Sequence, residues 1–201
     1  MDVEAELYRA WVAGDRNAGA RLIERALPSV SRFFANKVVA TAEHEDLVAM
    51  TFERCAKSLG GWRGAGSFRG YVLGIALNVL RDELRRRAPP VPMGSASHAA
   101  RGPSPSAALA ERDEQRLLLA GLRAIPIEYQ TVRELQLFED LSRDECAALL
   151  GVPAGTVASR VRRARELLAA AVEQLAGTLA LAETTVSGID AWARSVRERL
   201  V

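Results

Sequence analysis

Cysteine, histidine and lysine are scarce in this chain of 201 residues, which contains two of each. Cys55 and Cys146 lie far apart in the sequence, and His44 and His98 add no metal-ligand spacing, so we predict neither a zinc site nor a disulfide. Both cysteines are expected to be small core residues, and His44 a solvated turn residue. The sequence also lacks a phosphate-binding loop and a cluster of nucleophile, base and acid. We therefore predict no metal, no cofactor and no enzymatic activity.

Long apolar runs are absent as well. No segment is long enough to span a bilayer, and the first residues lack a signal-peptide pattern, so we expect no membrane insertion and a cytoplasmic location. The formal net charge is only +2. This charge is too small to imply a nucleic-acid partner by itself, so any such binding has to come from local clusters of charge.

Apolar and polar residues rarely alternate along the chain, whereas apolar residues spaced three and four apart recur, so the sequence predicts an all-α protein. Residues 88–106 are rich in proline, serine and glycine, which is typical of a flexible linker. This linker would join two small helical domains, residues 1–87 and 107–176, and a C-terminal helical extension would follow over residues 177–201. Helices are expected over residues 3–13, 15–27, from Pro28 onward, 41–59, 67–87, 107–122 and 128–138.

A helix-turn-helix is predicted over residues 141–168. Ser142 and Glu145 have the S-x-x-E spacing of a capping box, in which each side chain satisfies a backbone N–H group at a helix start. Gly151 suits the left-handed conformation that ends a helix, and Pro153 suits the first position of the next helix. A capped helix, a short turn and a second helix are the arrangement of many DNA-binding proteins.

The second helix of this pair has two unlike faces. One face is an apolar stripe formed by Val157, Val161, Ala164 and Leu168. The other begins with small residues, which allow a close approach to a surface, and continues with arginines that can reach guanine edges or phosphates. A solvated basic face is the alternative interpretation.

These residues carry a family resemblance. The segment resembles the C-terminal domain of bacterial sigma-70 family factors of the extracytoplasmic-function (ECF) group at Leu141, Ser142, Glu145, Ala147, Leu150, Gly151, Val152, Pro153, Gly155, Thr156, Val157, Ser159, Arg160, Arg163 and Ala164. In that family the helix-turn-helix binds the minus-thirty-five promoter element. The resemblance therefore implies that the upstream element contacts Thr156, Ser159, Arg160, Arg162 and Arg163.

The predicted helix over residues 41–59 also has a buried and an outward face. Apolar spacing selects four positions for burial, Val48, Phe52, Cys55 and Leu59. The outward face would carry Asp46, Ala49, Met50, Glu53 and Lys57, where exposed apolar residues rimmed by charge suit a docking surface. An ordinary amphipathic surface is the alternative. The segment 46–52 resembles the sigma helix that binds the coiled coil of the polymerase beta-prime subunit, which implies polymerase binding by Asp46, Ala49, Met50 and Glu53.

A glycine-rich loop over residues 60–71 holds Trp62, Phe68 and Tyr71 among arginines that include Arg63. Aromatic faces stack on unpaired bases while arginines hold the backbone, so this composition suits the capture of single-stranded DNA. The alternative is a turn whose aromatic rings fold back into the core, and for the loop alone that alternative is preferred.

The helix that Ser67 begins favours the first interpretation. Its inner face should be Val72, Leu73, Ala76, Val79 and Leu80, and its outer face Asn78, Arg81, Asp82 and Arg85. The segment 68–86 resembles sigma region 2, in which this helix and its preceding loop recognise the minus-ten element and hold a flipped base. The resemblance implies contacts to the downstream element, and a role in melting, for Trp62, Arg63, Phe68, Asn78, Arg81 and Arg85.

With two matched blocks in the expected order, the chain is identified as an alternative sigma factor. The resemblance implies three partners: RNA polymerase core through its beta-prime and beta subunits, promoter DNA, and an anti-sigma factor. Two other interpretations stay open, a helix-turn-helix regulator that binds duplex DNA by itself and a helical adaptor that sequesters other regulators. The C-terminal extension is expected to add to the second domain's core, or else to restrain the DNA-binding surfaces.

Overall fold

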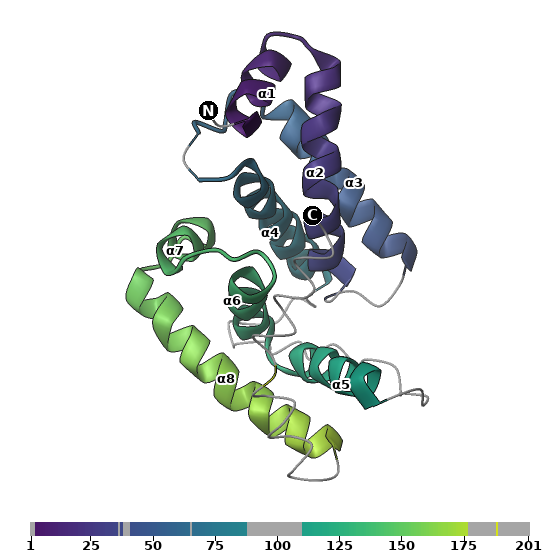
Figure 1. The fold of residues 1–201 in the computed structure, drawn as a ribbon, viewed down its shortest axis with the longest axis vertical. Coiled ribbons are helices and arrows are strands. Elements are labelled where there is room, and N and C mark those ends of the chain that lie inside the picture. Colours follow the sequence, from purple (N-terminus) through teal and green to yellow (C-terminus); the bar gives the residue numbers. More distant parts are fainter. Residues whose placement is uncertain are drawn as a thin grey trace. The chain divides into compact units, whose positions relative to one another are not determined.

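The computed structural model describes residues 3–35, 37, 41–64, 66–87, 110–176 and 188. Over these residues the chain forms helices, turns and bends and contains no strand, so the all-α prediction is confirmed. It divides into two compact units, Met1–Gly94 and Ser95–Val201, whose helices run from purple to blue and from teal to yellow-green in Figure 1. The predicted linker lies outside the described residues, as does the C-terminal extension apart from Gly188. Within the described helices, none has the length and hydropathy needed to cross a membrane.

In the first unit the described helices are α1 (Val3–Val12), α2 (Arg16–Ala35), α3 (Thr41–Lys57) and α4 (Phe68–Arg87). α2 packs against the three others, and α3 also packs against α4. The centre of this unit is formed by fully buried side chains from three helices, among them Leu22, Val30, Phe34, Leu47, Val72, Leu73 and Ala76. Burying these side chains holds α3 and α4 side by side, each with one face outward.

α2 corrects one predicted boundary. Asp15 caps this helix as expected, since its Oδ1 accepts hydrogen bonds from the N–H groups of Asn17 and Ala18. Pro28, however, does not open a separate helix but lies inside α2. The helix continues because buried residues on both sides of Pro28, including Ala26 and Val30, form one unbroken apolar face. Burial of that face offsets the roughly 3 kcal/mol that an interior proline costs.

In the second unit the described helices are α5 (Ala110–Ala124), α6 (Ile127–Leu137), α7 (Arg143–Leu150) and α8 (Ala154–Ala176). α8 is the longest and packs against the other three. The unit's main cluster of buried side chains comes from α5, the end of α6 and α8, and contains Leu118, Leu122, Ile125, Leu137, Phe138, Ala164, Leu168 and Val172. Gly121 lets α5 approach α8 closely, because a Cβ atom there would lie 2.7 Å from Val172 Cγ2.

Candidate functional site

The turn between α7 and α8 has the geometry that the sequence predicted. Ser142 Oγ accepts a hydrogen bond from the Glu145 N–H at 3.2 Å, and Glu145 Oε2 accepts one from the Ser142 N–H at 2.8 Å, which completes the capping box. α7 ends at Gly151, whose φ of +68° is in the left-handed region. The carbonyl of Pro153 then accepts the N–H groups of Thr156 and Val157, which starts α8. The structure confirms the predicted helix-turn-helix in this segment.

α8 keeps the predicted division between its two faces. Val157, Ala164 and Leu168 are fully buried and Val161 is half-buried. Of the residues predicted to contact the upstream element, Ser159, Arg162 and Arg163 are exposed, while Thr156 and Arg160 are half-buried. Burial of the apolar stripe therefore directs the predicted DNA-binding face outward.

The exposed side chains of α8 differ in whether they already form ion pairs or hydrogen bonds within the chain. Arg163 Nη1 lies 2.8 Å from Glu166 Oε2, and the Ser159 hydroxyl donates to the Thr156 carbonyl at 2.9 Å. Arg162 forms no ion pair with any residue of the part of the chain that the structure describes. Gly155, on the same face, has nothing within 4 Å of the position that a Cβ atom would take. The fold therefore does not require glycine there.

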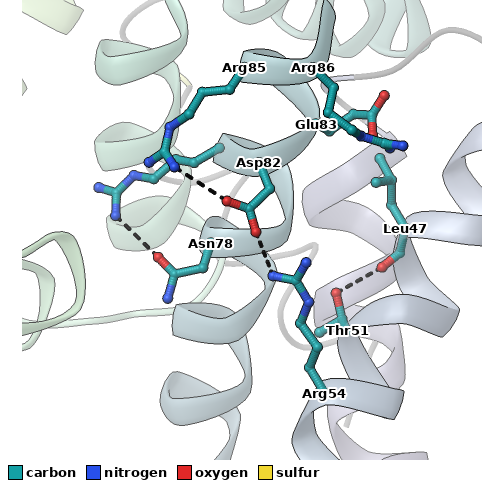
Figure 2. Close-up of polar contacts among 9 residues, drawn as sticks. Leu47, Thr51, Arg54, Asn78, Asp82, Glu83, Arg85 and Arg86 are labelled. Atoms are coloured by element: carbon teal, nitrogen blue, oxygen red, sulfur yellow. Dashed lines mark hydrogen bonds and ion pairs between the residues drawn. The ribbon is translucent and has the colours of Figure 1, made fainter.

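α3 is rotated relative to the prediction. Leu47, Thr51 and Cys55 form its buried stripe, whereas Val48 and Phe52 are half-buried. The Thr51 hydroxyl is satisfied inside the core by the Leu47 carbonyl at 2.8 Å (Figure 2). Leu59 was predicted to be buried but is 42% exposed. Leu59 lies beyond the end of α3 at Lys57, in the turn before Gly60, whose φ is +90°.

The predicted docking surface on α3 is largely exposed. Asp46, Ala49 and Glu53 are exposed and Met50 is half-buried. Glu53 Oε1 lies 2.5 Å from Lys57 Nζ, and this hydrogen bond and the charge of Lys57 lower the pKa of Glu53. The surface is therefore a small apolar patch with an acidic rim.

The loop before α4 follows the alternative interpretation, in which its aromatic rings fold back into the core, and not the capture of single-stranded DNA. The rings of Trp62 and Phe68 are buried, at 6% and 1% exposure, and form edge contacts with each other at a centroid distance of 5.6 Å. Stacking on an unpaired base needs an exposed ring face, so the base-stacking roles predicted for Trp62 and Phe68 are wrong for this structure. Both rings fold back because Tyr8 and Trp11 of α1 provide aromatic partners for them. Arg63 is exposed in the same loop.

α1 holds this loop at both ends, a role that the sequence reasoning missed. Tyr8 Oη accepts hydrogen bonds from the N–H groups of Gly60 at 2.8 Å and of Trp62 at 3.2 Å. Glu4 Oε2 accepts one from the N–H group of Phe68 at 2.9 Å, at the start of α4. The aromatic composition of the loop was a signal for such packing, but nothing local in the sequence pointed to α1 as the partner.

The outer face of α4 carries the remaining predicted residues. Asn78 and Arg85 are exposed, Arg81 is half-buried, and Arg81 Nη1 donates to Asn78 Oδ1 at 3.4 Å. Asp82 lies between these arginines and accepts a hydrogen bond at 2.7 Å from Nη1 of Arg54, a residue of α3 (Figure 2). Arg54 was not among the predicted site residues, because only the packing of α3 on α4 brings it there.

Cys55, Cys146 and His44 all lie in packed surroundings. Cys55 and Cys146 are buried, and burial raises the pKa of each thiol to about 11. His44 corrects the prediction of a solvated turn residue: it lies in α3, is half-buried, and its Nε2 lies 2.8 Å from the Ser31 carbonyl of α2. Among the residues that the structure describes, no group of three histidine, cysteine or acidic side chains could hold a metal ion.

Two family models match this chain, sigma-70 region 2 over residues 22–89 and sigma-70 region 4 over residues 115–168. The chain belongs to the sigma-70 family, in its ECF group. It is 27% identical to the RNA polymerase sigma-H factor of Pseudomonas aeruginosa, over 87% of this chain and 96% of that protein. It is 24% identical to the ECF RNA polymerase sigma-E factor of Haemophilus influenzae, over 81% and 91% of the two chains.

A solved structure agrees with this assignment at the level of the fold. CnrH, solved in complex with the cytosolic domain of CnrY, superposes with a TM-score of 0.62 and 24% identity, over 86% of this chain and 99% of that chain. The region 2 match covers most of α2 together with α3 and α4. The region 4 match covers most of α5 together with α6 and α7 and the first part of α8.

Proposed function

We propose that this sigma-70 family protein is an alternative sigma factor that joins RNA polymerase core, recognises two promoter elements and promotes melting of the downstream one. The upstream element is assigned to Thr156, Ser159, Arg160, Arg162 and Arg163. The downstream element is assigned to Arg63, Asn78, Arg81 and Arg85. The protein is proposed to act in the cytoplasm, where bacterial transcription takes place, without being an enzyme.

The outward face of α8 carries the proposal. It combines an exposed arginine, Arg162, with a glycine, Gly155, that the fold itself does not require. In the interior of a helix glycine costs about 0.5–1 kcal/mol relative to alanine, and Gly155, in the first turn of α8, has up to that cost. No neighbouring atom in the fold explains why Gly155 is a glycine. A close approach of the DNA to the start of α8 would explain it. Arginine farther along the same face can then reach base edges in the major groove.

Polymerase binding is proposed for the α3 surface of Asp46, Ala49, Met50 and Glu53. Its apolar centre is small and its rim is acidic, so a basic partner surface with one apolar contact would fit it. Ala49→Glu adds a charged side chain at an exposed position, so it should weaken binding to polymerase core without changing the fold. Ala20→Glu, at an exposed alanine of α2, is the matched control. Equal affinities of both variants for core would remove α3 from the interface.

We also propose an anti-sigma factor as a regulatory partner. The similar protein CnrH was solved with the cytosolic domain of a second protein, CnrY, which supports the idea that surfaces of this fold are covered by a partner protein. Copurification of the full chain from its own cells, followed by mass spectrometry, should identify a partner that blocks transcription when it is added back. A partner without effect on transcription would not be an anti-sigma factor.

The deciding experiment adds the purified chain to sigma-free bacterial core polymerase and measures transcription on a library of genomic fragments. Initiation at a defined set of promoters is expected, and aligning them should reveal two short elements. Tight binding to a palindromic site without polymerase would instead favour a stand-alone regulator. A chain that binds neither polymerase nor DNA would favour the helical adaptor.

A further inference from the structure

Asp82 occupies the middle of the basic surface on α4 and the adjoining part of α3. Its Oδ2 lies 2.7 Å from Arg54 Nη1, and its Oδ1 lies 3.5 Å from Arg85 Nη1. Figure 2 shows the carboxylate between the two guanidinium groups, one reaching up from α3 and one reaching down from the next turn of α4. The side chains of Asp82 and Arg54 are 44% and 41% exposed, so a ligand from solvent can reach both.

The same pairing continues at the end of α4. Glu83 forms ion pairs with both Arg86 and Arg87, and Arg87 also pairs with Glu43 of α3. Five arginines of α3 and α4, Arg54, Arg81, Arg85, Arg86 and Arg87, therefore have three carboxylates of the same chain among them, those of Asp82, Glu83 and Glu43. Four of these five arginines are held by acidic side chains of the same chain. A DNA phosphate has to compete with these carboxylates for the positive charge of the guanidinium groups.

We propose that Asp82 is a specificity-determining residue, which withholds Arg54 and Arg85 from DNA phosphates of any sequence. This inference rests on the proposed function of the α4 face in promoter binding. Phosphate contacts carry no sequence information, and they supply most of the affinity for non-specific DNA. Holding two arginines in internal ion pairs lowers that affinity, whereas the amide of Asn78, an uncharged group that can read a base, stays exposed beside them.

A purely structural role does not account for the arrangement. α3 and α4 pack against each other, and apolar side chains of both helices, Leu47, Cys55 and Leu73, are already completely buried. Ion pairs with side chains this exposed typically add little to stability. Such a pair therefore adds little to folding stability, whereas its carboxylate competes with DNA phosphates for Arg54 and Arg85.

The test measures binding of the full chain, without polymerase, to a non-specific DNA duplex by fluorescence anisotropy at several salt concentrations. Asp82→Asn keeps the size of the side chain and removes its charge. Each new phosphate contact steepens the plot of log affinity against log salt by about 0.9. Release of one or two arginines is expected to steepen the slope by about 0.9 to 1.8, with tighter binding at low salt. Glu24→Gln, an equal charge change at an exposed position of α2, controls for net charge.

A second set of variants assigns the effect to the ion pairs. Arg54→Gln alone should leave the slope close to that of the wild type, because Arg54 is withheld there. In the Asp82→Asn background, Arg54→Gln should remove about one phosphate contact, which lowers the steepness of the log affinity against log salt plot by about 0.9. Asp82→Glu keeps the charge and should retain the wild-type slope even if its melting temperature falls.

The inference is overturned if Asp82→Asn and Glu24→Gln have equal slopes and affinities, or if Asp82→Asn binds DNA more weakly than the wild type. These measurements use no polymerase and no promoter, so they can fail while promoter-dependent transcription by the wild-type chain succeeds. With core polymerase present, Asp82→Asn should lower the ratio of promoter to non-specific binding. An unchanged ratio together with a steeper slope would also overturn the assigned role in specificity.

Discussion

The outer faces of α4 and α8 are both proposed to bind DNA, yet they present their arginines differently. On α8, Arg162 is exposed and has no ion pair within the described chain, although Arg163 is paired with Glu166. On α4 and the neighbouring α3, Arg54 and Arg85 share the carboxylate of Asp82. If both faces bind DNA as proposed, α8 offers a duplex an arginine without an internal ion pair, whereas Arg54 and Arg85 on the α4 side already share a carboxylate with which DNA would compete.

The two faces also differ in what supports them. The start of α8 is supported by neighbours in sequence, through the capping box of Ser142 and Glu145 and the left-handed Gly151. The start of α4 depends on α1, because Tyr8 and Glu4 accept hydrogen bonds from backbone groups that are 52 to 64 residues away. A change far from the site is therefore expected to affect the α4 face and to spare the α8 face.

The largest expected effect separates the two arginines of α8. Arg162→Ala should cost about 1–3 kcal/mol of binding to the upstream element, and relax the preference at one base, if the guanidinium binds a guanine edge. Arg163→Ala should cost less, because Glu166 competes with DNA for the Arg163 guanidinium. Affinities of both variants for a panel of single-base promoter changes measure this. Equal losses on every sequence would mean phosphate contacts instead.

A smaller effect is expected from Tyr8→Phe, which keeps the ring and removes the oxygen that accepts two N–H groups. Loss of such hydrogen bonds typically costs about 1 kcal/mol, or about fivefold in an equilibrium. The equilibrium constant for opening the downstream element should fall by about fivefold. It is measured by 2-aminopurine fluorescence in a promoter bound to core polymerase and the variant. Binding of the upstream element should not change. Tyr129→Phe, at a half-buried tyrosine of α6, is the control; equal opening by the two variants would contradict the role of α1.

Gly155→Ala should separate stability from binding on α8. An alanine Cβ meets nothing within 4 Å, so the free energy of unfolding of the second unit should rise by up to about 1 kcal/mol. Affinity for the upstream element should fall if the backbone there approaches DNA. Thermal melting and promoter binding are measured on the same preparation. A more stable variant with unchanged affinity would show that α8 binds DNA, if at all, without close contact at its first turn.

The smallest effect concerns pH, and it tests whether the stabilities of the two units depend on pH in the same way. Each contains a buried cysteine, Cys55 or Cys146, with its pKa raised from 9.0 to about 11. Folding therefore favours the protonated thiol, and this contribution to stability is complete below pH 9 and is lost as the pH rises from 9 to 11. Alkylation by iodoacetamide at pH 8 should be slow at both sites until the protein unfolds. Rapid labelling of one cysteine alone would show that its unit opens independently.

Much of the fold follows from local features of the sequence. Asp15, Ser67, Ser142 and Gly151 lie at helix ends as expected, because a cap needs only a side chain and the backbone within a few residues. Pro28 is the exception among these local signals. Its effect on α2 was decided by packing on both sides of it, which the proline alone does not reveal.

The candidate site was predictable where one helix supplies all of it. On α8 and on α4, apolar spacing separated the buried face from the outward one, and the structure agrees for Val157, Leu168, Val72 and Ala76. α3 was predicted less well. Its buried stripe includes the polar Thr51, whose hydroxyl bonds to the helix backbone, so a count of apolar residues placed the stripe on neighbouring positions.

By itself the sequence determined the capped helix ends and which residues form the helix-turn-helix, because capping and helical periodicity act over a few residues. Only the tertiary structure decided that Trp62 is buried against Tyr8, and that Arg54 meets Asp82 from a helix 28 residues earlier in the chain. Those contacts join residues that are distant in sequence. Their formation depends on how α1 and α3 pack against the rest of the unit, a property that no local pattern encodes.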